Sequence, residues 1–423
     1  MAMIYEGFDI NSAYDYKVEK LLAEIAASNC NVRLYGCGIQ ARTAILLLTK
    51  LGLGEKISLY DSNKSKTGAS FCGYQVNHTS ELDDLPNSTV LITCCFPDQV
   101  FKSLDARHTI YSILPLYKQN VSTISESDLD STGLNYSRSM SDMGREMQLY
   151  ENELLAFKSK LSPSLLNLKS IDAVVTEGCS LKCEDCSNLM QYYVKPKSVD
   201  LDVLVKSTQK ILDSVDHVYE WRILGGEPLI YRHLAEYLCY LSSSDKINSI
   251  LIYTNGTMLP NAELIAALKT SKAFLDVSNY QTLSRNIQKL SQICDQNSIP
   301  YAIKDPLWTD SGRIHPHKNE SESELKTKFF NCCTKDVLTL LHGKLYHCPF
   351  SANLINLDEK YLHVNDVIDV INYAGLPETL RADISSFYIS KPYLDACNYC
   401  NGRDYTVPII PTAIQTRKPL PLP

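Results

Sequence analysis

Long hydrophobic runs are absent from this sequence of 423 residues. No segment approaches the roughly 18 consecutive apolar residues of a membrane-spanning helix, so we expect no membrane partner. The first residues carry neither the basic nor the apolar region of an export signal, so we expect a cytoplasmic protein. Basic residues are also fewer than acidic ones. The net charge of −7 argues against a nucleic-acid partner, whose binding face is usually strongly basic.

Cysteine, by contrast, is abundant, with 15 residues in the chain. Without an export signal, metal binding is a better interpretation of this number than disulfides. Cys179, Cys183 and Cys186 form a C-x3-C-x2-C motif after a β-branched stretch, 171–176, that predicts a strand. A closed zinc site needs four protein ligands, whereas an iron–sulfur cluster on three thiolates leaves one iron open. A zinc knuckle and three unrelated core cysteines are the alternatives.

Residues 1–120 alternate short strands with helical segments, which predicts a parallel sheet. Within them, Gly36-x-Gly38-x-x-Ala41 lies between a strand and a helix, and Asp61 ends the next strand. This is the context of a dinucleotide-binding fingerprint. Two interpretations stay open: a site for a nucleotide or nucleotide-sugar, and a Rossmann-like scaffold that binds neither.

A second strand–helix rhythm begins at Ser170, in a domain expected from residue 166 onward, after a linker and connecting helix at 121–165. The candidate strands are 171–176, 218–224, 249–254, 274–278 and 299–304. Functional residues are expected at the C-terminal ends of such strands. The turn Gly225-Gly226-Glu227-Pro228, Asn255 and Ser278 occupy these positions. Two adjacent glycines also let a ligand approach the backbone closely.

The cysteine spacing, the strand before it and the later Gly-Gly-Glu-Pro turn resemble the radical S-adenosylmethionine (radical SAM) superfamily. The resemblance implies a partial (β/α)6 barrel over 166–326, a [4Fe–4S] cluster on the three cysteines and SAM on its open iron. It also implies cofactor-binding roles at the turn and strand ends, for Gly225, Gly226, Glu227, Pro228, Asn255 and Ser278. Many members carry an aromatic residue before the third cysteine, where this chain has Asp185.

A second set of cysteines follows the barrel. Cys333 and Cys348 frame a C-x9-G-x4-C pattern, and Cys397 and Cys400 follow as C-x2-C. This resembles the twitch domain of radical SAM enzymes, here over 327–405, and implies one auxiliary [4Fe–4S] cluster without an open iron. A structural zinc site is the alternative. Cys332 could replace Cys333, although the spacing favours Cys333. The proline-rich tail, 406–423, is expected to be extended over the surface or disordered.

The expected fold class is therefore α/β, with a Rossmann-like parallel sheet, a partial (β/α)6 barrel and a small cysteine-rich twitch hairpin domain. The resemblance implies reductive cleavage of SAM, with an electron from a flavodoxin- or ferredoxin-type protein, and hydrogen abstraction by a 5′-deoxyadenosyl radical.

Our first hypothesis for the function is a dehydrogenase or epimerase acting on a hydroxyl-bearing small molecule, such as a sugar, cyclitol or nucleotide-sugar. A maturase for a ribosomally made peptide and a non-enzymatic iron–sulfur scaffold are the alternatives. Strand alternation makes Arg222 and Lys304 the candidates for a base or a substrate anchor.

Overall fold

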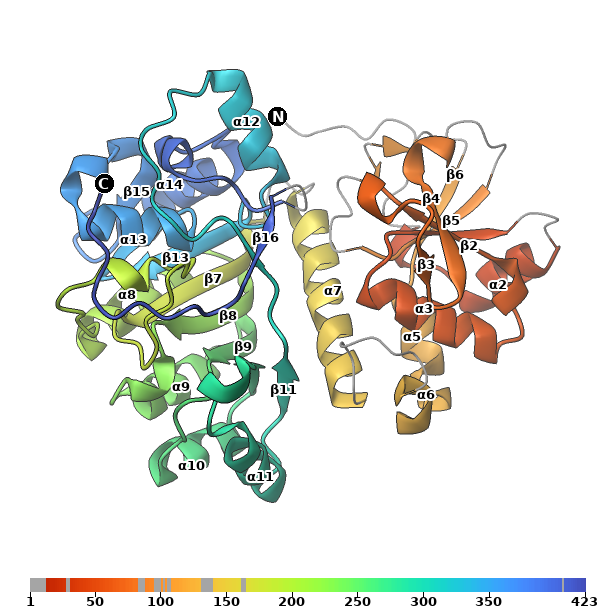
Figure 1. The fold of residues 1–423 in the computed structure, drawn as a ribbon, viewed down its shortest axis with the longest axis horizontal. Coiled ribbons are helices and arrows are strands. Elements are labelled where there is room, and N and C mark those ends of the chain that lie inside the picture. The colour runs from red at the N-terminus through yellow and green to blue at the C-terminus, as the bar shows by residue number, and fades with distance from the viewer. Residues whose placement is uncertain are drawn as a thin grey trace. The chain divides into compact units, whose positions relative to one another are not determined.

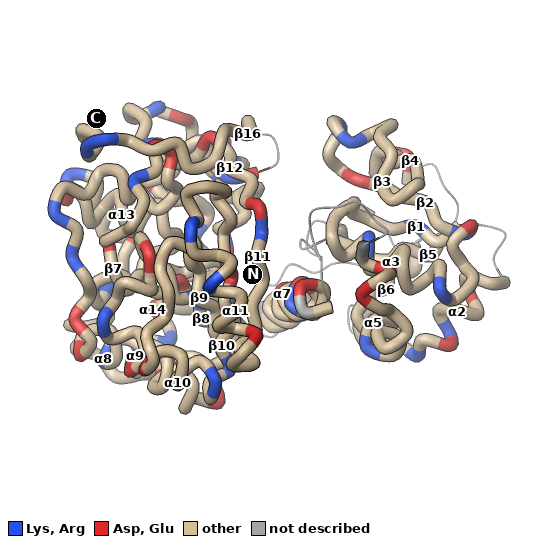
Figure 2. Tube along the Cα trace, turned by 60° about the horizontal axis from the view of Figure 1, so that its bottom comes forward, with Lys and Arg blue, Asp and Glu red and all other residues tan. Residues whose placement is uncertain are grey.

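The computed structural model describes residues 13–27, 31–82, 88–94, 100–101, 103–104, 108–130, 140–160, 165–404 and 407–423. The chain folds into two compact units, residues 1–163 and 164–423 (Figure 1). Acidic and basic side chains are interspersed along both units (Figure 2). None of the helices in the described ranges combines the length and hydropathy that a membrane span needs.

Unit 1 contains a six-stranded sheet with the order β3-β4-β2-β1-β5-β6. Its strands are β1 (Val32–Tyr35), β2 (Ile57–Asp61), β3 (Ser70–Phe71), β4 (Tyr74–His78), β5 (Ser88–Ile92) and β6 (His108–Ser112). All neighbours pair in parallel except β3 and β4. The order of the five parallel strands is the 3-2-1-4-5 of doubly wound sheets.

The α-helices of unit 1 whose bounds lie in the described ranges are α2 (Val18–Ala27), α3 (Ile39–Lys50), α5 (Leu114–Asn120), α6 (Glu126–Asp130) and α7 (Met140–Lys160). The long helix α7 buries Met143, Met147, Tyr150 and Leu154 in the hydrophobic core of this unit. The Tyr150 hydroxyl also donates to the carbonyl of Ile92 at the end of β5. Helix α7, expected as a connecting helix, therefore packs into the core of unit 1.

Unit 2 is built on an eight-stranded sheet with the order β11-β10-β9-β8-β7-β13-β14-β15. Its strands are β7 (Asn167–Thr176), β8 (His217–Gly225), β9 (Ile247–Thr254), β10 (Ala273–Ser278), β11 (Tyr301–Lys304), β13 (Val337–Leu341), β14 (Lys344–Tyr346) and β15 (Val367–Asp369). The strands from β11 to β13 in this order are parallel, and the last two pairs are antiparallel. A separate two-stranded pair joins β12 (Trp308–Thr309) to β16 (Ile409–Ile410).

Helices connect the first five strands of unit 2 in a repeated β–α pattern (Figure 1). They are α8 (Leu201–Ser214), α9 (Leu234–Ser242), α10 (Ala262–Thr270) and α11 (Ile287–Asn297), followed later by α12 (Glu322–Asn331), α13 (Pro349–Leu357) and α14 (Pro377–Ser390). Side chains alternate along each strand, so one face of the sheet is apolar. Ile171, Trp221 and Ile250 lie in register on that face and belong to the hydrophobic core.

These observations confirm the α/β class with parallel sheets. The sixth parallel strand is β13, which pairs with β7, with Leu338 opposite Ile171. The β13–β14 hairpin therefore continues the sheet that carries the barrel strands. Its turn places both His342 (φ 47°) and Gly343 (φ 79°) in the left-handed region, as a two-residue hairpin turn requires.

Candidate active site

The first three cysteines lie on the loop that follows β7. Cys183 is buried, and Cys179 and Cys186 are half-buried. Burial raises the pKa of Cys179 to about 12 and that of Cys183 to about 11, and it also raises the pKa of Cys186. The metal-free thiols therefore hold their protons at neutral pH, and metal binding must release them.

The turn at the end of β8 packs directly against this loop. The Gly226 N–H donates to the Thr176 carbonyl over 2.8 Å, and the Glu227 N–H donates to the Gly178 carbonyl over 2.8 Å. A Cβ atom on Gly226 would lie 2.0 Å from the Gly178 oxygen and 2.8 Å from Cys179 Cβ. Glycine is needed here because the two chain segments touch through their backbones.

The Glu227 carboxylate ties this turn to the end of β9. It is fully buried and accepts hydrogen bonds from the N–H groups of Leu229 and Asn255 and from the Thr254 hydroxyl, over 2.8–3.0 Å. Burial raises its pKa, and these donors oppose the shift. Both oxygens of Glu227 are thus used to hold the site together. Pro228, the fourth residue of the turn, is buried at the start of a 3-10 turn.

The two remaining candidate contacts for SAM lie at the ends of neighbouring strands. Asn255 Nδ2 is 3.6 Å from Cys179 Sγ and 3.1 Å from the Ser180 hydroxyl, so Asn255 borders the cysteine loop. Ser278 ends β10, where its carbonyl accepts a hydrogen bond from the Ser284 hydroxyl over 3.1 Å. The Ser284 hydroxyl is also 2.7 Å from the Asn255 carbonyl, so the two strand ends share one partner.

Asp185 anchors a distant segment to the cysteine loop. The Arg313 guanidinium pairs with both Asp185 and Glu184. The preceding residue, Gly312, packs so closely that a Cβ atom would lie 1.9 Å from the Asp185 carbonyl oxygen. The residue that replaces the family's aromatic position therefore holds the 312–313 segment against the loop.

The polar face of the sheet carries paired charges. Arg222 Nε is 2.5 Å from Asp172 Oδ1 on the adjacent strand, and Lys304 Nζ is 3.1 Å from Asp276 Oδ2. Burial lowers the pKa of Arg222, but Asp172 and other neighbours raise it by a larger amount, so the guanidinium stays charged. Both candidate residues, Arg222 and Lys304, are therefore held in ion pairs on one face of the sheet.

The second group of cysteines lines a cavity between α12, α13 and the chain after α14. Cys332, Cys348, Cys397 and Cys400 line it, whereas Cys333 is an exposed residue outside the lining. The Cys333 thiol donates a hydrogen bond to Cys332, which lowers the pKa of Cys332. Burial raises the pKa of Cys348 to about 12, and it also raises that of Cys397 and Cys400.

Residues 173–291, which carry the cysteine loop, the glycine turn and Asn255, match the family model described as the Radical SAM superfamily. This domain belongs to the radical SAM superfamily. Curated relatives include the GTP 3′,8-cyclase of Syntrophomonas wolfei, 27% identical over 36% of this chain and 45% of the relative. The enzyme of the same name from Clostridium acetobutylicum is 25% identical over 30% of this chain and 42% of the relative. The chain thus spans less than half the length of these two relatives.

Similar solved structures include BtrN in complex with AdoMet and 2-DOIA. That likeness covers 60% of this chain and 97% of BtrN, at 14% identity and a TM-score of 0.35. Streptococcus suis SuiB bound to S-adenosylmethionine covers 63% of this chain and 76% of its own, at 14% identity and a TM-score of 0.31.

The radical SAM family implies a [4Fe–4S] cluster and SAM, and the cysteine loop fits thiolate ligands of such a cluster. Each sulfur has an N–H group directed at it. The donors are Leu181 N and Asn255 Nδ2 for Cys179, Gln415 Nε2 for Cys183, and the backbone of Asn188 and Met190 for Cys186. Hydrogen bonds of this kind stabilise cluster sulfurs.

Three further residues near the two cysteine groups are not among the site residues expected from the sequence. Tyr280 is half-buried; desolvation raises the pKa of its hydroxyl, and the nearby Cys186 and Cys183 raise it further. Arg403 lines the second cysteine cavity, and Gln415 donates to Cys183. Tyr280 follows a strand end and could have been found there. Arg403 and Gln415 lie in segments without a local signal.

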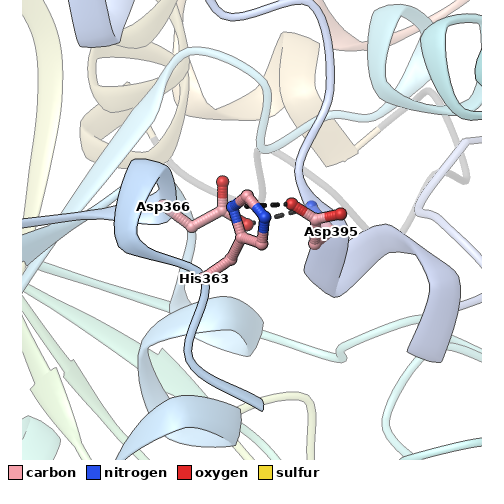
Figure 3. A group of neighbouring side chains, drawn as sticks. All are labelled: His363, Asp366 and Asp395. Atoms are coloured by element: carbon pink, nitrogen blue, oxygen red, sulfur yellow. Dashed lines mark hydrogen bonds and ion pairs between the residues drawn. The ribbon is translucent and has the colours of Figure 1, made fainter.

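Among the described residues, one group of three possible metal ligands lies within 4.8 Å: His363, Asp366 and Asp395 (Figure 3). His363 Nδ1 is 3.0 Å from Asp395 Oδ2, and the Asp395 N–H donates to Asp366 Oδ2 over 2.9 Å. Lys391 Nζ is 2.6 Å from the other Asp366 oxygen. The Asp366 carboxylate is thus already paired with the Lys391 ammonium. The three side chains therefore fit a structural role, in which they connect the 363–366 segment to Asp395.

Proposed function

We propose that this protein is a radical SAM oxidoreductase that abstracts hydrogen from a hydroxyl-bearing small molecule, such as a sugar, cyclitol or nucleotide-sugar. Oxidation or epimerisation would follow. One observation carries the radical SAM chemistry: the cysteine loop is hydrogen-bonded to the Gly225–Pro228 turn, and both lie within the matched domain.

Cys179, Cys183 and Cys186 would hold a [4Fe–4S] cluster, and the turn with Asn255 would hold SAM beside it. When bound, these groups supply a 5′-deoxyadenosyl radical that takes a hydrogen atom from an unactivated carbon. The chain's own contribution is positional. Glu227 fixes the turn against the end of β9, and Arg313 fixes the 312–313 segment against the cysteine loop.

The polar face of the sheet supports a polar substrate. Arg222 with Asp172 and Lys304 with Asp276 present hydrogen-bonding groups along neighbouring strands. A guanidinium does not give up its proton in a protein, so Arg222 serves as an anchor for substrate oxygens rather than as a base. Lys304 is held as an ammonium by the Asp276 carboxylate 3.1 Å away, so it too would serve as an anchor for substrate oxygens rather than as a base.

The second cysteine group would hold an auxiliary [4Fe–4S] cluster. Cys332 replaces Cys333 in this proposal, because Cys332 lines the cavity with the other three cysteines. Ser351 N donates to Cys348 Sγ over 3.3 Å, and Gly402 N donates to Cys400 Sγ over 3.2 Å. These donors and the cationic Arg403 suit an anionic cluster. Four protein ligands leave no open iron, which favours an electron-transfer role.

Unit 1 fits a scaffold better than a nucleotide site. The Asp61 carboxylate accepts hydrogen bonds from the Cys37 N–H and from Lys66, both over 2.9 Å. Lys66 also donates to the Cys37 carbonyl over 3.2 Å. Asp61, the acid expected to bind a ribose, is thus hydrogen-bonded to the turn expected to bind phosphates. The hydrogen-bonding groups of both are occupied within the protein.

The radical SAM assignment is tested with Cys183→Ala. With dithionite and SAM, the wild type should form 5′-deoxyadenosine and the variant should form none. Cys239→Ala is the matched control, because Cys239 is an exposed residue on α9, outside the site. Activity retained in Cys183→Ala would overturn the assignment. Flavodoxin or ferredoxin should replace dithionite if either is the reductant.

The product type is tested by mass spectrometry of candidate sugars and cyclitols after turnover. Oxidation removes a hydrogen atom, a proton and an electron, so the product is lighter by roughly two mass units, whereas epimerisation leaves the mass unchanged. Deoxyadenosine formation that is stimulated by a peptide and by no polyhydroxylated compound would instead support the maturase alternative.

A further inference from the structure

The C-terminal segment lies along the cysteine loop instead of leaving the surface. The Glu184 N–H donates to the Ile414 carbonyl, and the Thr416 N–H donates to the Lys182 carbonyl, both over 2.7 Å. Cys183 and Gln415 form an antiparallel β-bridge between these bonds. The segment therefore adds a short strand to the loop that carries the candidate cluster ligands.

The Gln415 side chain completes this contact with three hydrogen bonds. Its Oε1 accepts from the Lys182 N–H over 2.8 Å. Its Nε2 donates to the Ala413 carbonyl over 2.8 Å and to Cys183 Sγ over 3.1 Å. Because the oxygen must face the Lys182 N–H, the amide orientation is fixed, and one N–H is left to point at the sulfur.

The chain is held on both sides of Gln415. On one side, β16 pairs with β12, with Ile410 opposite Trp308. On the other side, the Leu420 N–H donates to the Gln191 carbonyl over 2.8 Å, and Leu420 packs on the core of unit 2. Two independent attachments therefore fix the segment over Cys183, and Figure 1 shows it running from β16 across unit 2 to the C-terminus.

We propose that residues 409–420 form part of the cluster site and that Gln415 is a positioning residue for Cys183. The N–H···S bond holds the Cys183 sulfur in its ligating orientation and stabilises the extra negative charge of the reduced cluster. Two effects follow: tighter retention of iron, and a higher reduction potential than the three cysteines would give alone. This inference rests on the proposed [4Fe–4S] cluster at Cys179, Cys183 and Cys186.

The test uses the full chain with Cys348→Ala and Cys397→Ala as background, so that only the first cluster is loaded. Gln415→Leu removes all three side-chain hydrogen bonds. Gln415→Glu keeps the acceptor for Lys182 and replaces the N–H donor with a carboxylate oxygen. Thr416→Val is the matched control, because the Thr416 hydroxyl donates to Lys418 and its link to the loop is through the backbone.

Two readouts are measured: iron retained against a chelator, and the midpoint potential of the cluster followed by EPR. We expect iron affinity to fall by ~10-fold in both Gln415 variants, the lower end for loss of a group that orients a metal ligand. The potential should become more negative in both, and most in Gln415→Glu. The control should match the background protein.

The possible failures are distinguishable. If the background protein binds about four irons and both Gln415 variants match Thr416→Val, the inference about Gln415 is wrong while the cluster stands. If only Gln415→Glu changes the potential, charge rather than the N–H···S bond is responsible, and the inference is again wrong. If the background protein binds no cluster, the proposed function itself fails.

Discussion

Arg403 connects the two groups of cysteines: its Nη2 donates a hydrogen bond to the carbonyl oxygen of Ser187 over 3.1 Å. Ser187 follows Cys186 in the first group, and the Arg403 side chain lines the cavity of the second group with Cys332 and Cys400. Burial would lower the pKa of Arg403, but the surrounding sulfurs raise it, so its charge is fixed.

Replacing Arg403 should therefore change the redox behaviour of the proposed auxiliary cluster. Loss of a buried positive charge within several ångströms should lower its reduction potential by on the order of 100 mV, from Coulomb's law at an intermediate dielectric constant. EPR-monitored titration of Arg403→Gln checks this, with Arg403→Lys as the charge-retaining control. Equal potentials in wild type and Arg403→Gln would contradict the assignment.

The choice between neighbouring cysteines can be tested by iron content. Cys332 lines the second cavity and Cys333 does not. We expect Cys332→Ala to lower the iron content from about eight to about four per chain, because one of four ligands is lost. Cys333→Ala is the matched control and should retain about eight. The opposite pattern would restore Cys333 as the ligand, and about four irons in the wild type would remove the auxiliary cluster.

The glycine turn offers a paired test within one site. A Cβ atom on Gly226 would lie 2.0 Å from a backbone oxygen, whereas a Cβ atom on Gly178 would lie 3.0 Å from the flexible end of Ile230. Gly226→Ala should therefore lower the free energy of unfolding by about 1–3 kcal/mol and abolish SAM binding. Gly178→Ala should keep both near the wild-type values, as denaturation and calorimetric titration would check. Normal SAM binding by Gly226→Ala would contradict the proposed site.

Acid sensitivity should depend on Glu177, which is buried beside the first cysteine. Burial raises its pKa, but hydrogen bonds from His342, Lys197 and Asn356 outweigh this, so the pKa lies below its usual 4.5. A lowered carboxyl pKa stabilises the fold above the usual value, and this contribution is lost as the pH falls through the lowered pKa.

Glu177→Gln should thus be less stable than the wild type by about 1–3 kcal/mol at pH 7, because charged hydrogen bonds are lost. The difference should shrink as the pH falls below about 4.5. Urea denaturation across this range measures it, with Glu378→Gln at an exposed position of α14 as the control. A difference that is constant with pH would exclude the carboxylate as its source.

Local sequence patterns were sufficient for most of the barrel. The expected strand at 218–224 corresponds to β8, and that at 274–278 corresponds to β10. Runs of β-branched and aromatic residues that end at Gly, Asn or Ser carry this information within a few positions. The motif Cys179–Cys186 and the Gly225 turn are also local, and the match to the family model confirms the superfamily.

Contacts between distant segments could not be predicted in this way. The pairing of β13 with β7 depends on which sheet edge is free after folding, and no periodicity in either strand encodes that choice. Whether Cys332 or Cys333 faces the second cavity depends on the exact residue at which α12 ends. The sequence spacing between these cysteines and Gly343 does not contain that information. Arg403 and Gln415 act only because folding brings them to the cysteines.

The bridge between Cys183 and Gln415 sets an order of events during biosynthesis. The two residues are 232 positions apart, so at about 5–20 residues per second Gln415 is made roughly 10–50 s after Cys183. During that interval the ribosome-bound chain carries its three cysteines without the strand that later covers them. The proposed cluster site can therefore reach its complete form, with the Gln415 amide against the Cys183 sulfur, only after residue 415 has been made.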